Sequence, residues 1–258
     1  MTSVVGPFSE RVIIQPAWPH FVGHFAGRPI LPGIAHLALV RDALRRIVDP
    51  ELELVAVTVL RLRQVVEPGD GIELQVSPRG EPEWAFELRR GCDLASTGVV
   101  ASGHCAAPGA AVGGVRAGGE RFPTPEALIP HRGPALLLDA VVEAADDRLV
   151  ASAVVPHGSA FAAQGLAPPF VALEVAAQAA AAFEALRRRR AGGNPEPRVG
   201  YLVGARDVVL HTGLPVEVPL QVTIRLDAAL PPLSTYLFEV GAGGAVAANG
   251  TISTYMAS

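Results

Sequence analysis

The chain has 258 residues, of which 50% are hydrophobic and 18% are charged, so its composition excludes an intrinsically disordered protein. Its net charge of -4 gives no overall attraction for nucleic acid, and no nucleic-acid partner is expected. Two cysteines cannot build a disulfide framework or a zinc site, which favours a reducing, cytoplasmic location.

Two long stretches without Asp, Glu, Lys or Arg, residues 94–115 and 149–173, are candidates for a membrane span. Several Gly and Pro residues interrupt both, so neither predicts a lipid-spanning helix. Residues 1–10 lack the basic and apolar regions of a signal peptide.

The first half predicts one long helix among strands. A short strand at 11–15 leads through a Pro-rich loop to a helix at 34–47, whose apolar stripe includes Leu37 and Leu44. Strand-like runs follow at 52–66, 72–77, 84–90 and 95–101.

Residues 103–121 are rich in Gly and Ala without periodicity and are predicted to form a linker between domains 1–102 and 122–258. The second half repeats the order of elements, with a helix at 170–190. Strands are predicted at 135–143, 148–155, 199–210, 218–226, 235–240 and 245–255. One helix embedded among strands in each half favours an α+β fold in which an antiparallel sheet wraps around a central helix.

Residues 23–33, GHFAGRPILPG, form the most specific motif of the chain. They resemble the GHFPGxPxxPG signature of FabZ-type 3-hydroxyacyl-carrier-protein dehydratases, although Ala26 stands where that family has proline. In the family, an acidic residue on the helix follows the histidine by fourteen positions. Here the residue fourteen positions after His24 is Ala38, so the first half lacks the acid.

The second half contains the complementary motifs. Residues 129–139, IPHRGPALLLD, resemble the opening of the same family, and Glu174 to Gln178 resemble its E-x-x-A-Q helix start. Fourteen positions before Glu174 lies Ala160, so this half has the acid without the histidine.

The resemblance implies a double hot-dog fold, with two antiparallel sheets that each wrap around a long central helix. Hot-dog dehydratases of this type place the histidine of one subunit against the acid of its partner. A fused pair therefore implies one composite site per chain, formed by His24 and Glu174. The chain is similar to the paired dehydratase subunits of aryl-polyene and related highly reducing type II polyketide pathways.

The implied reaction converts a 3-hydroxyacyl carrier-protein thioester into the trans-2-enoyl thioester without a metal or another cofactor. His24 suits the role of base because an imidazole titrates near neutral pH. We expect Glu174 to act as the acid, with a pKa raised by burial. The backbone N–H groups of Gly33 and Ile34 are expected to stabilise the enolate oxygen at a helix N-terminus. Phe25 and Gln178 complete the predicted substrate-binding set.

Other conspicuous polar residues favour structural roles. His131 and Arg132 are interpreted as structural in this family and are left out of the predicted site. The same interpretation applies to the remaining histidines: His20, His36, His104, His157 and His211. The run Arg187 to Arg190 is better explained as a solvated helix end than as a carrier-protein docking surface.

The expected partners are an acyl carrier protein and a ketosynthase/chain-length-factor complex, and homodimerisation of the fused unit stays open. Two other functions remain as alternatives. A hot-dog thioesterase could use Glu174 to activate water, and a catalytically inactive partner of a synthase could retain His24 as a remnant. A MaoC-type hydratase is disfavoured, because no Asp lies five residues before any histidine.

Overall fold

The computed structural model describes residues 6–25, 27–107 and 122–256. Ala26 and residues 108–121, most of the predicted linker, lie outside the described residues, and the domain boundaries at 102 and 122 stay predictions. No described helix is long and apolar enough to cross a membrane.

The first half contains one long helix, α1 (Gly33–Ile47), as its sequence predicts. Its strands are β1 (Phe8–Ile13), β2 (Glu53–Leu62), β3 (Gly71–Gly80), β4 (Glu83–Arg90) and β5 (Asp93–Gly103). A single turn of 3-10 helix, η1 (Pro19–Phe21), lies in the loop between β1 and α1. Ile34, Leu37 and Leu44, which belong to the apolar stripe of α1, are fully buried.

The second half is built around α3 (Val171–Arg190), close to the predicted range of 170–190. Its main strands are β6 (Leu138–Ala144), β7 (Arg148–Ala153), β9 (Gly200–Leu210), β11 (Leu220–Leu230), β12 (Leu233–Ala242) and β13 (Ala245–Met256). Four short elements were not predicted from the sequence: α2 (Pro125–Leu128), η2 (Gly133–Ala135), β8 (Leu166–Ala167) and β10 (Leu214–Pro215).

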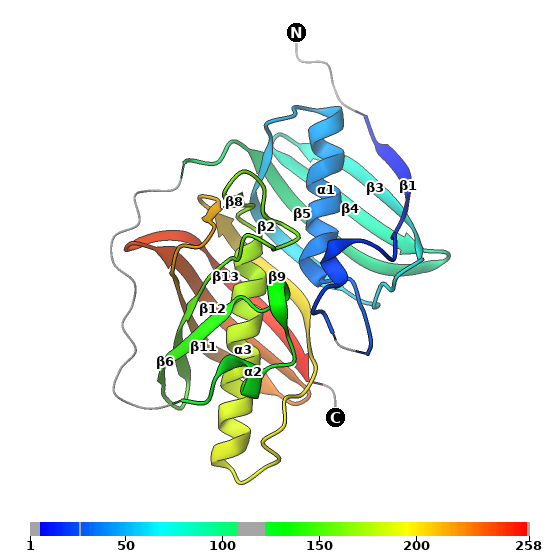
Figure 1. Cartoon of the computed structure of the whole chain (residues 1–258). Coiled ribbons are helices and arrows are strands. Elements are labelled where there is room, and N and C mark those ends of the chain that lie inside the picture. The colour runs from blue at the N-terminus through cyan, green and yellow to red at the C-terminus, as the bar shows by residue number, and fades with distance from the viewer. Residues whose placement is uncertain (1–5, 26, 108–121, 257–258) are drawn as a thin grey trace.

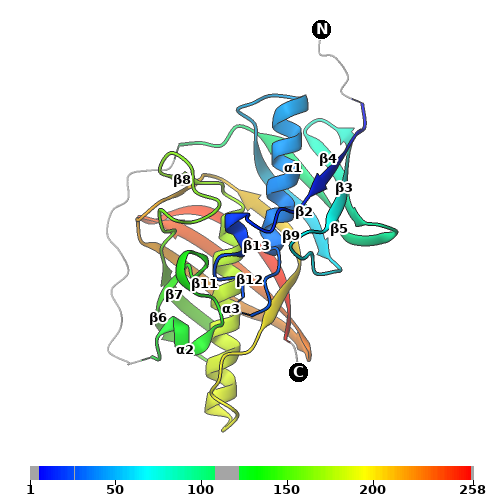
Figure 2. The same cartoon turned by 45° about the vertical axis from the view of Figure 1, so that its right-hand side comes forward.

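The two predicted sheets are joined edge to edge into one eleven-stranded sheet, in the order β1-β3-β4-β5-β2-β9-β13-β12-β11-β7-β6. The junction is the antiparallel pair β2 and β9, where Leu60 lies opposite Ala205. Each long helix lies against the strands of its own half (Figures 1 and 2), and α1 also contacts α3. The helix N-termini, with the loops that precede them, therefore meet near the middle of the molecule.

The arginines at the end of α3 are held by backbone carbonyl groups. Arg188 donates hydrogen bonds to Asn194 and Glu196, Arg189 donates to Ala127 and Pro195, and Arg190 donates to Ala144. These bonds connect the end of α3 to α2, to β6 and to the loop after α3. Arg188, Arg189 and Arg190 therefore have a structural role at the end of this helix.

Two loops from different halves are fastened together at Gly23 and Arg132. The Arg132 backbone N–H donates a hydrogen bond to the Gly23 carbonyl oxygen over 3.2 Å. Gly23 has a φ of +85°, and a Cβ atom there would lie 1.8 Å from the Arg132 carbonyl oxygen. Only glycine fits this position, because a side chain would push the two loops apart.

We predict that Gly23→Ala destabilises the fold more than the matched change Gly27→Ala. Gly27 also has a positive φ, of +77°, but an added Cβ would meet no atom within 4 Å. Gly27→Ala should cost about 1–2 kcal/mol of unfolding free energy from backbone strain alone. Gly23→Ala should cost about 1–3 kcal/mol more because of the steric overlap. Urea unfolding measures both, and equal losses would contradict the described contact.

Candidate active site

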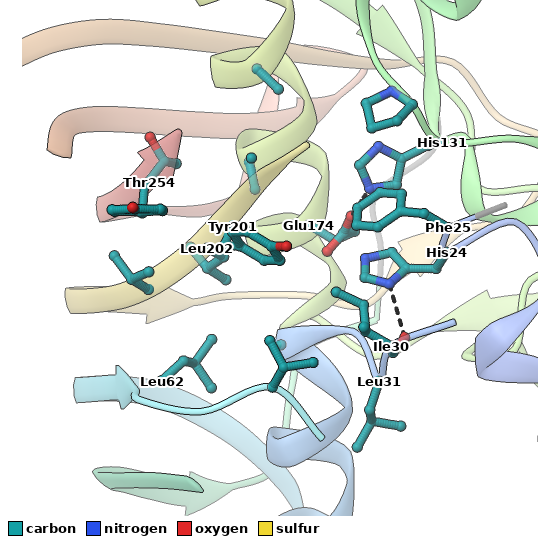
Figure 3. A pocket seen from close by; sticks show the side chains of 18 of the residues that line it. His24, Phe25, Ile30, Leu31, Leu62, His131, Glu174, Tyr201, Leu202 and Thr254 are labelled. Carbon is teal, nitrogen blue, oxygen red and sulfur yellow. Dashed lines mark hydrogen bonds and ion pairs between the residues drawn. The ribbon is translucent and has the colours of Figure 1, made fainter. Parts of the chain in front are cut away.

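A cavity of about 330 Å³ runs between the two halves. Its walls come from the loop before α1, the starts of α1 and β9, and the ends of β2 and β13 (Figure 3). Most of the wall is apolar, including Leu31, Leu62 and Leu202, and small residues of α3 line one side. His24 and Glu174 both line this cavity, and Figure 3 shows their side chains next to each other.

His24 is buried, with 7% of its surface exposed, and its ring orientation is fixed by one hydrogen bond. The Nδ1 atom lies 3.0 Å from the Ile30 carbonyl oxygen. A carbonyl oxygen only accepts, so Nδ1 has the proton and Nε2 keeps a free lone pair. Burial lowers the pKa of His24 below 6.5, although the charge of Glu174 partly offsets that effect. The geometry thus gives a neutral imidazole with a basic Nε2.

Glu174, in the first turn of α3, is 8% exposed, accepts a hydrogen bond from Gln178 and lies in ion-pair distance of His131. Its Oε1 atom lies 3.0 Å from Gln178 Nε2 and 3.3 Å from His131 Nε2. Burial raises the pKa of Glu174, but the hydrogen bond and charge of His131, with help from His24 and Gln178, lower it to about 2. The predicted upward shift of this pKa is therefore wrong, and the carboxylate is ionised at neutral pH.

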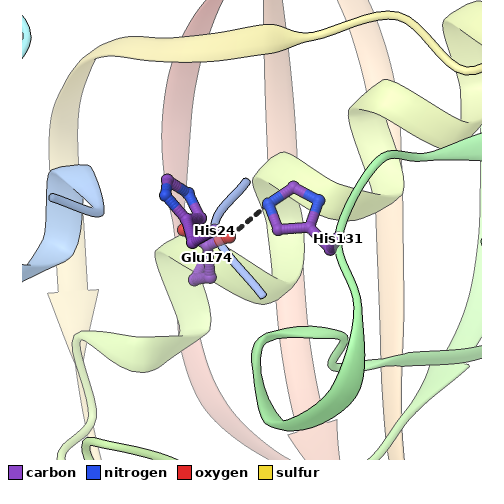
Figure 4. Close-up of side chains that lie close together, drawn as sticks. All are labelled: His24, His131 and Glu174. Atoms are coloured by element: carbon purple, nitrogen blue, oxygen red, sulfur yellow. Dashed lines mark ion pairs between the residues drawn. The ribbon is translucent and has the colours of Figure 1, made fainter. Parts of the chain in front are cut away.

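His131 also belongs to the site, although its sequence motif was interpreted as structural. Its ring is 6% exposed, contacts Glu174, and lies 5.2 Å from the His24 ring between centroids (Figure 4). The donor atoms of His24, His131 and Glu174 lie within 4.8 Å of one another, a set that could also ligate a metal ion. The PHR motif marks His131 in the sequence, but its contact with Glu174 depends on the fold.

Phe25, which was predicted to bind substrate, lies in the cavity wall. Its ring contacts both His24 and His131. Its ring stacks on His24 at 4.3 Å between centroids and meets His131 edge to face at 4.9 Å. These contacts restrict both imidazoles to one orientation.

Gly33 also lines the cavity, at the first position of α1. Among the described residues, neither the Gly33 nor the Ile34 backbone N–H has a hydrogen-bond partner, whereas Ala35 is bonded to Pro32. Free N–H groups at a helix N-terminus suit a developing negative charge. The side chain of Ile34 is fully buried and does not line the cavity.

Gln178 was predicted to bind substrate, but it lies behind Glu174, fully buried and outside the cavity lining. Its Oε1 atom accepts the N–H groups of Leu137 and Leu138, and its Nε2 atom donates to Ala135 and Glu174. Every hydrogen-bonding group of the amide is thus engaged within the protein. The geometry makes Gln178 a residue that orients Glu174.

His36, expected to be structural, forms part of the cavity wall. Its Nδ1 atom lies 2.8 Å from Ser96 Oγ, and burial lowers its pKa to about 4. The ring is therefore uncharged at neutral pH and adds no fixed charge to the apolar cavity.

Ala38 and Ala160 hold the positions of the acid and the histidine that each half lacks, and aromatic rings pack next to Ala160. Phe161 meets His20 and Phe170 edge to face, and the Arg41 guanidinium lies over the Phe170 ring at 5.4 Å. Neither alanine offers a proton-transfer group, so a second site with the chemistry of His24 and Glu174 is absent from these positions.

Comparisons with known proteins identify both halves. A family model described as ApeP dehydratase matches residues 123–258, and one described as ApeI dehydratase matches residues 8–103. The 3-hydroxyacyl-[acyl-carrier-protein] dehydratase FabZ of Rickettsia massiliae is 36% identical over 66 residues, covering 22% of this chain and 46% of that protein. FabZ of Verminephrobacter eiseniae is 35% identical over 69 residues, covering 23% and 46%. The chain thus spans about half the length of the curated relatives it matches.

Solved structures establish the fold. The dehydratase domain of PpsC from Mycobacterium tuberculosis, determined with C12:1-CoA, has a TM-score of 0.65 and 16% identity, covering 97% of this chain and 94% of that one. The dehydratase domain of RzxB from Pseudomonas fluorescens has a TM-score of 0.63 and 17% identity, covering 98% and 96%. The predicted double hot-dog fold is confirmed. Because the ApeP dehydratase model matches more than half of its length, the chain belongs to the ApeP-like dehydratase family, and residues 8–103 match the ApeI dehydratase model.

Proposed function

We propose that the chain removes water from a 3-hydroxyacyl thioester on an acyl carrier protein and releases the trans-2-enoyl thioester. The main support is the meeting of His24 and Glu174, from different halves, beside one cavity. Membership of a dehydratase family supports the same reaction. A polyketide, polyene or fatty-acid type of biosynthesis uses such a step.

In the proposed mechanism, His24 Nε2 takes one proton from C2 of the substrate. The C2–H electron pair forms the C2=C3 double bond, and the C3–O bond breaks. The departing hydroxide takes the proton back from the imidazolium and leaves as water, so the enzyme gains and loses one proton. Because Glu174 is ionised, we assign it to accepting a hydrogen bond from the C3 hydroxyl and to stabilising the imidazolium.

The thioester oxygen gains negative charge as the C2 proton leaves. In the proposal, the N–H groups of Gly33 and Ile34 at the start of α1 stabilise that charge. Gly33 lines the same cavity as His24, which supports this assignment.

The apolar cavity suits an acyl chain and its phosphopantetheine arm better than a free polar metabolite. We therefore propose an acyl carrier protein as the partner that delivers the substrate. Association with a ketosynthase/chain-length-factor complex and pairing of two fused units are further parts of this proposal.

We predict that His24→Ala and Glu174→Gln each reduce kcat for dehydration of a short 3-hydroxyacyl carrier protein by about 10²–10⁴-fold. The exposed His157 offers a matched control, and His157→Ala should retain wild-type activity. Mass spectrometry of the carrier-bound product measures the loss of water. A free acid as product would identify a thioesterase, and full activity of either site variant would remove that residue from the mechanism.

The pH dependence of kcat/KM should show an acidic limb set by His24. The base must be unprotonated, so kcat/KM should rise with pH through the His24 pKa and then reach a plateau. Since burial lowers that pKa from 6.5, we expect the midpoint of the limb below pH 6.5. A midpoint above pH 6.5 would contradict a neutral, buried His24 as the base.

A further inference from the structure

We infer that His131 is a positioning residue for this dehydration: it holds Oε1 of Glu174, so that Oε2 alone is left for the substrate. The inference rests on the proposed function, and it gives a role to the histidine of the PHR motif that sequence patterns leave unexplained. Three observations support it: the hydrogen bonds of Glu174, the fixation of His131, and the charges around the carboxylate.

The first observation is that both polar neighbours of Glu174, Gln178 and His131, approach the same carboxylate oxygen. Gln178 Nε2 and His131 Nε2 lie 3.0 Å and 3.3 Å from Oε1. Among the described residues, no hydrogen bond reaches Oε2. A carboxylate fixed through one oxygen keeps its plane and presents the other oxygen in a defined direction, as a precise proton-transfer geometry requires.

The second observation is that the loop of His131 is itself rigidly held. The Arg132 guanidinium donates to the carbonyl oxygens of Glu126, Ile129 and His131 over 2.6–3.0 Å. The same residue anchors Gly23, one position before His24. One loop therefore sets the places of both His131 and His24.

The third observation concerns protonation. Glu174 is ionised, so its contact with His131 Nε2 requires a proton on that nitrogen. The other ring nitrogen, Nδ1, is buried and has no partner among the described residues. Glu174 is therefore the one polar partner that the described residues give to the His131 ring.

The titratable groups that face Glu174 come from two segments, the loop between β1 and α1 and the loop before β6. His24 approaches from the loop before α1 and His131 from the loop before β6, while His20 lines a second cavity of about 30 Å³ beside the carboxylate. From its own helix, Gln178 contributes a neutral donor. Without His131, burial would dominate, and the pKa of Glu174 would rise.

The test compares His131→Leu with His131→Gln. A glutamine places its amide N–H near the position of Nε2 but cannot titrate, whereas leucine has no donor. We expect His131→Leu to lower kcat about 10–100-fold with little change in KM. The acidic limb of its kcat/KM profile should move to higher pH, because Glu174 must lose its proton before it can accept a hydrogen bond from the substrate hydroxyl. His131→Gln should restore most of the activity and the wild-type limb.

Two further variants make the outcome decisive. Adding Glu174→Gln to His131→Leu should abolish the new ionisation, which assigns it to Glu174. If the leucine variant does not fold, His131→Asn replaces it, since the shorter amide does not reach Oε1. Two results would overturn the inference. One is an acidic limb of His131→Leu, or of His131→Asn in its place, that matches the wild type. The other is a kcat of His131→Gln as low as that of the variant without a donor. Absence of dehydration in the wild type would instead refute the proposed function.

Discussion

A carboxylate removed from water needs hydrogen-bond donors inside the protein, and the site is organised around this need of Glu174. Two nitrogen atoms contact its oxygen Oε1: Nε2 of His131, from one loop, and Nε2 of Gln178, from the next turn of α3. The loop that supplies His131 also binds Gly23 and so places His24. The loop that contacts this buried charge thus also connects the second half to the loop that the first half contributes.

Local sequence patterns were sufficient to predict most of the fold. Both long helices begin within one residue of the predicted position. The apolar stripe of residues 34–47 predicted α1, and the long apolar run of residues 170–190 predicted α3. The junction between β2 and β9 could not be predicted in this way, because alternation along a strand does not identify its neighbour in the sheet. The two-residue strands β8 and β10 are too short to produce any periodic signal.

The candidate site was predictable only in part. The spacing of fourteen residues identified His24 and Glu174, because the two halves share a template and each lacks one group. His131 was missed since its contact with Glu174 joins residues 43 positions apart, through a loop whose path depends on Arg132. The pKa of Glu174 was predicted in the wrong direction for the same reason: burial can be inferred from sequence, whereas the compensating donors appear only in the folded chain.

The central claim is that one chain completes its own site, with His24 and Glu174 contributed by its two halves. Mixing the two inactive variants tests it most directly. His24→Ala and Glu174→Gln chains, unfolded and refolded together, should show no dehydration beyond the sum of their separate activities, because each chain has lost its own site. Recovery of activity in the mixture would mean that the two residues meet between chains, and it would contradict a site within one chain.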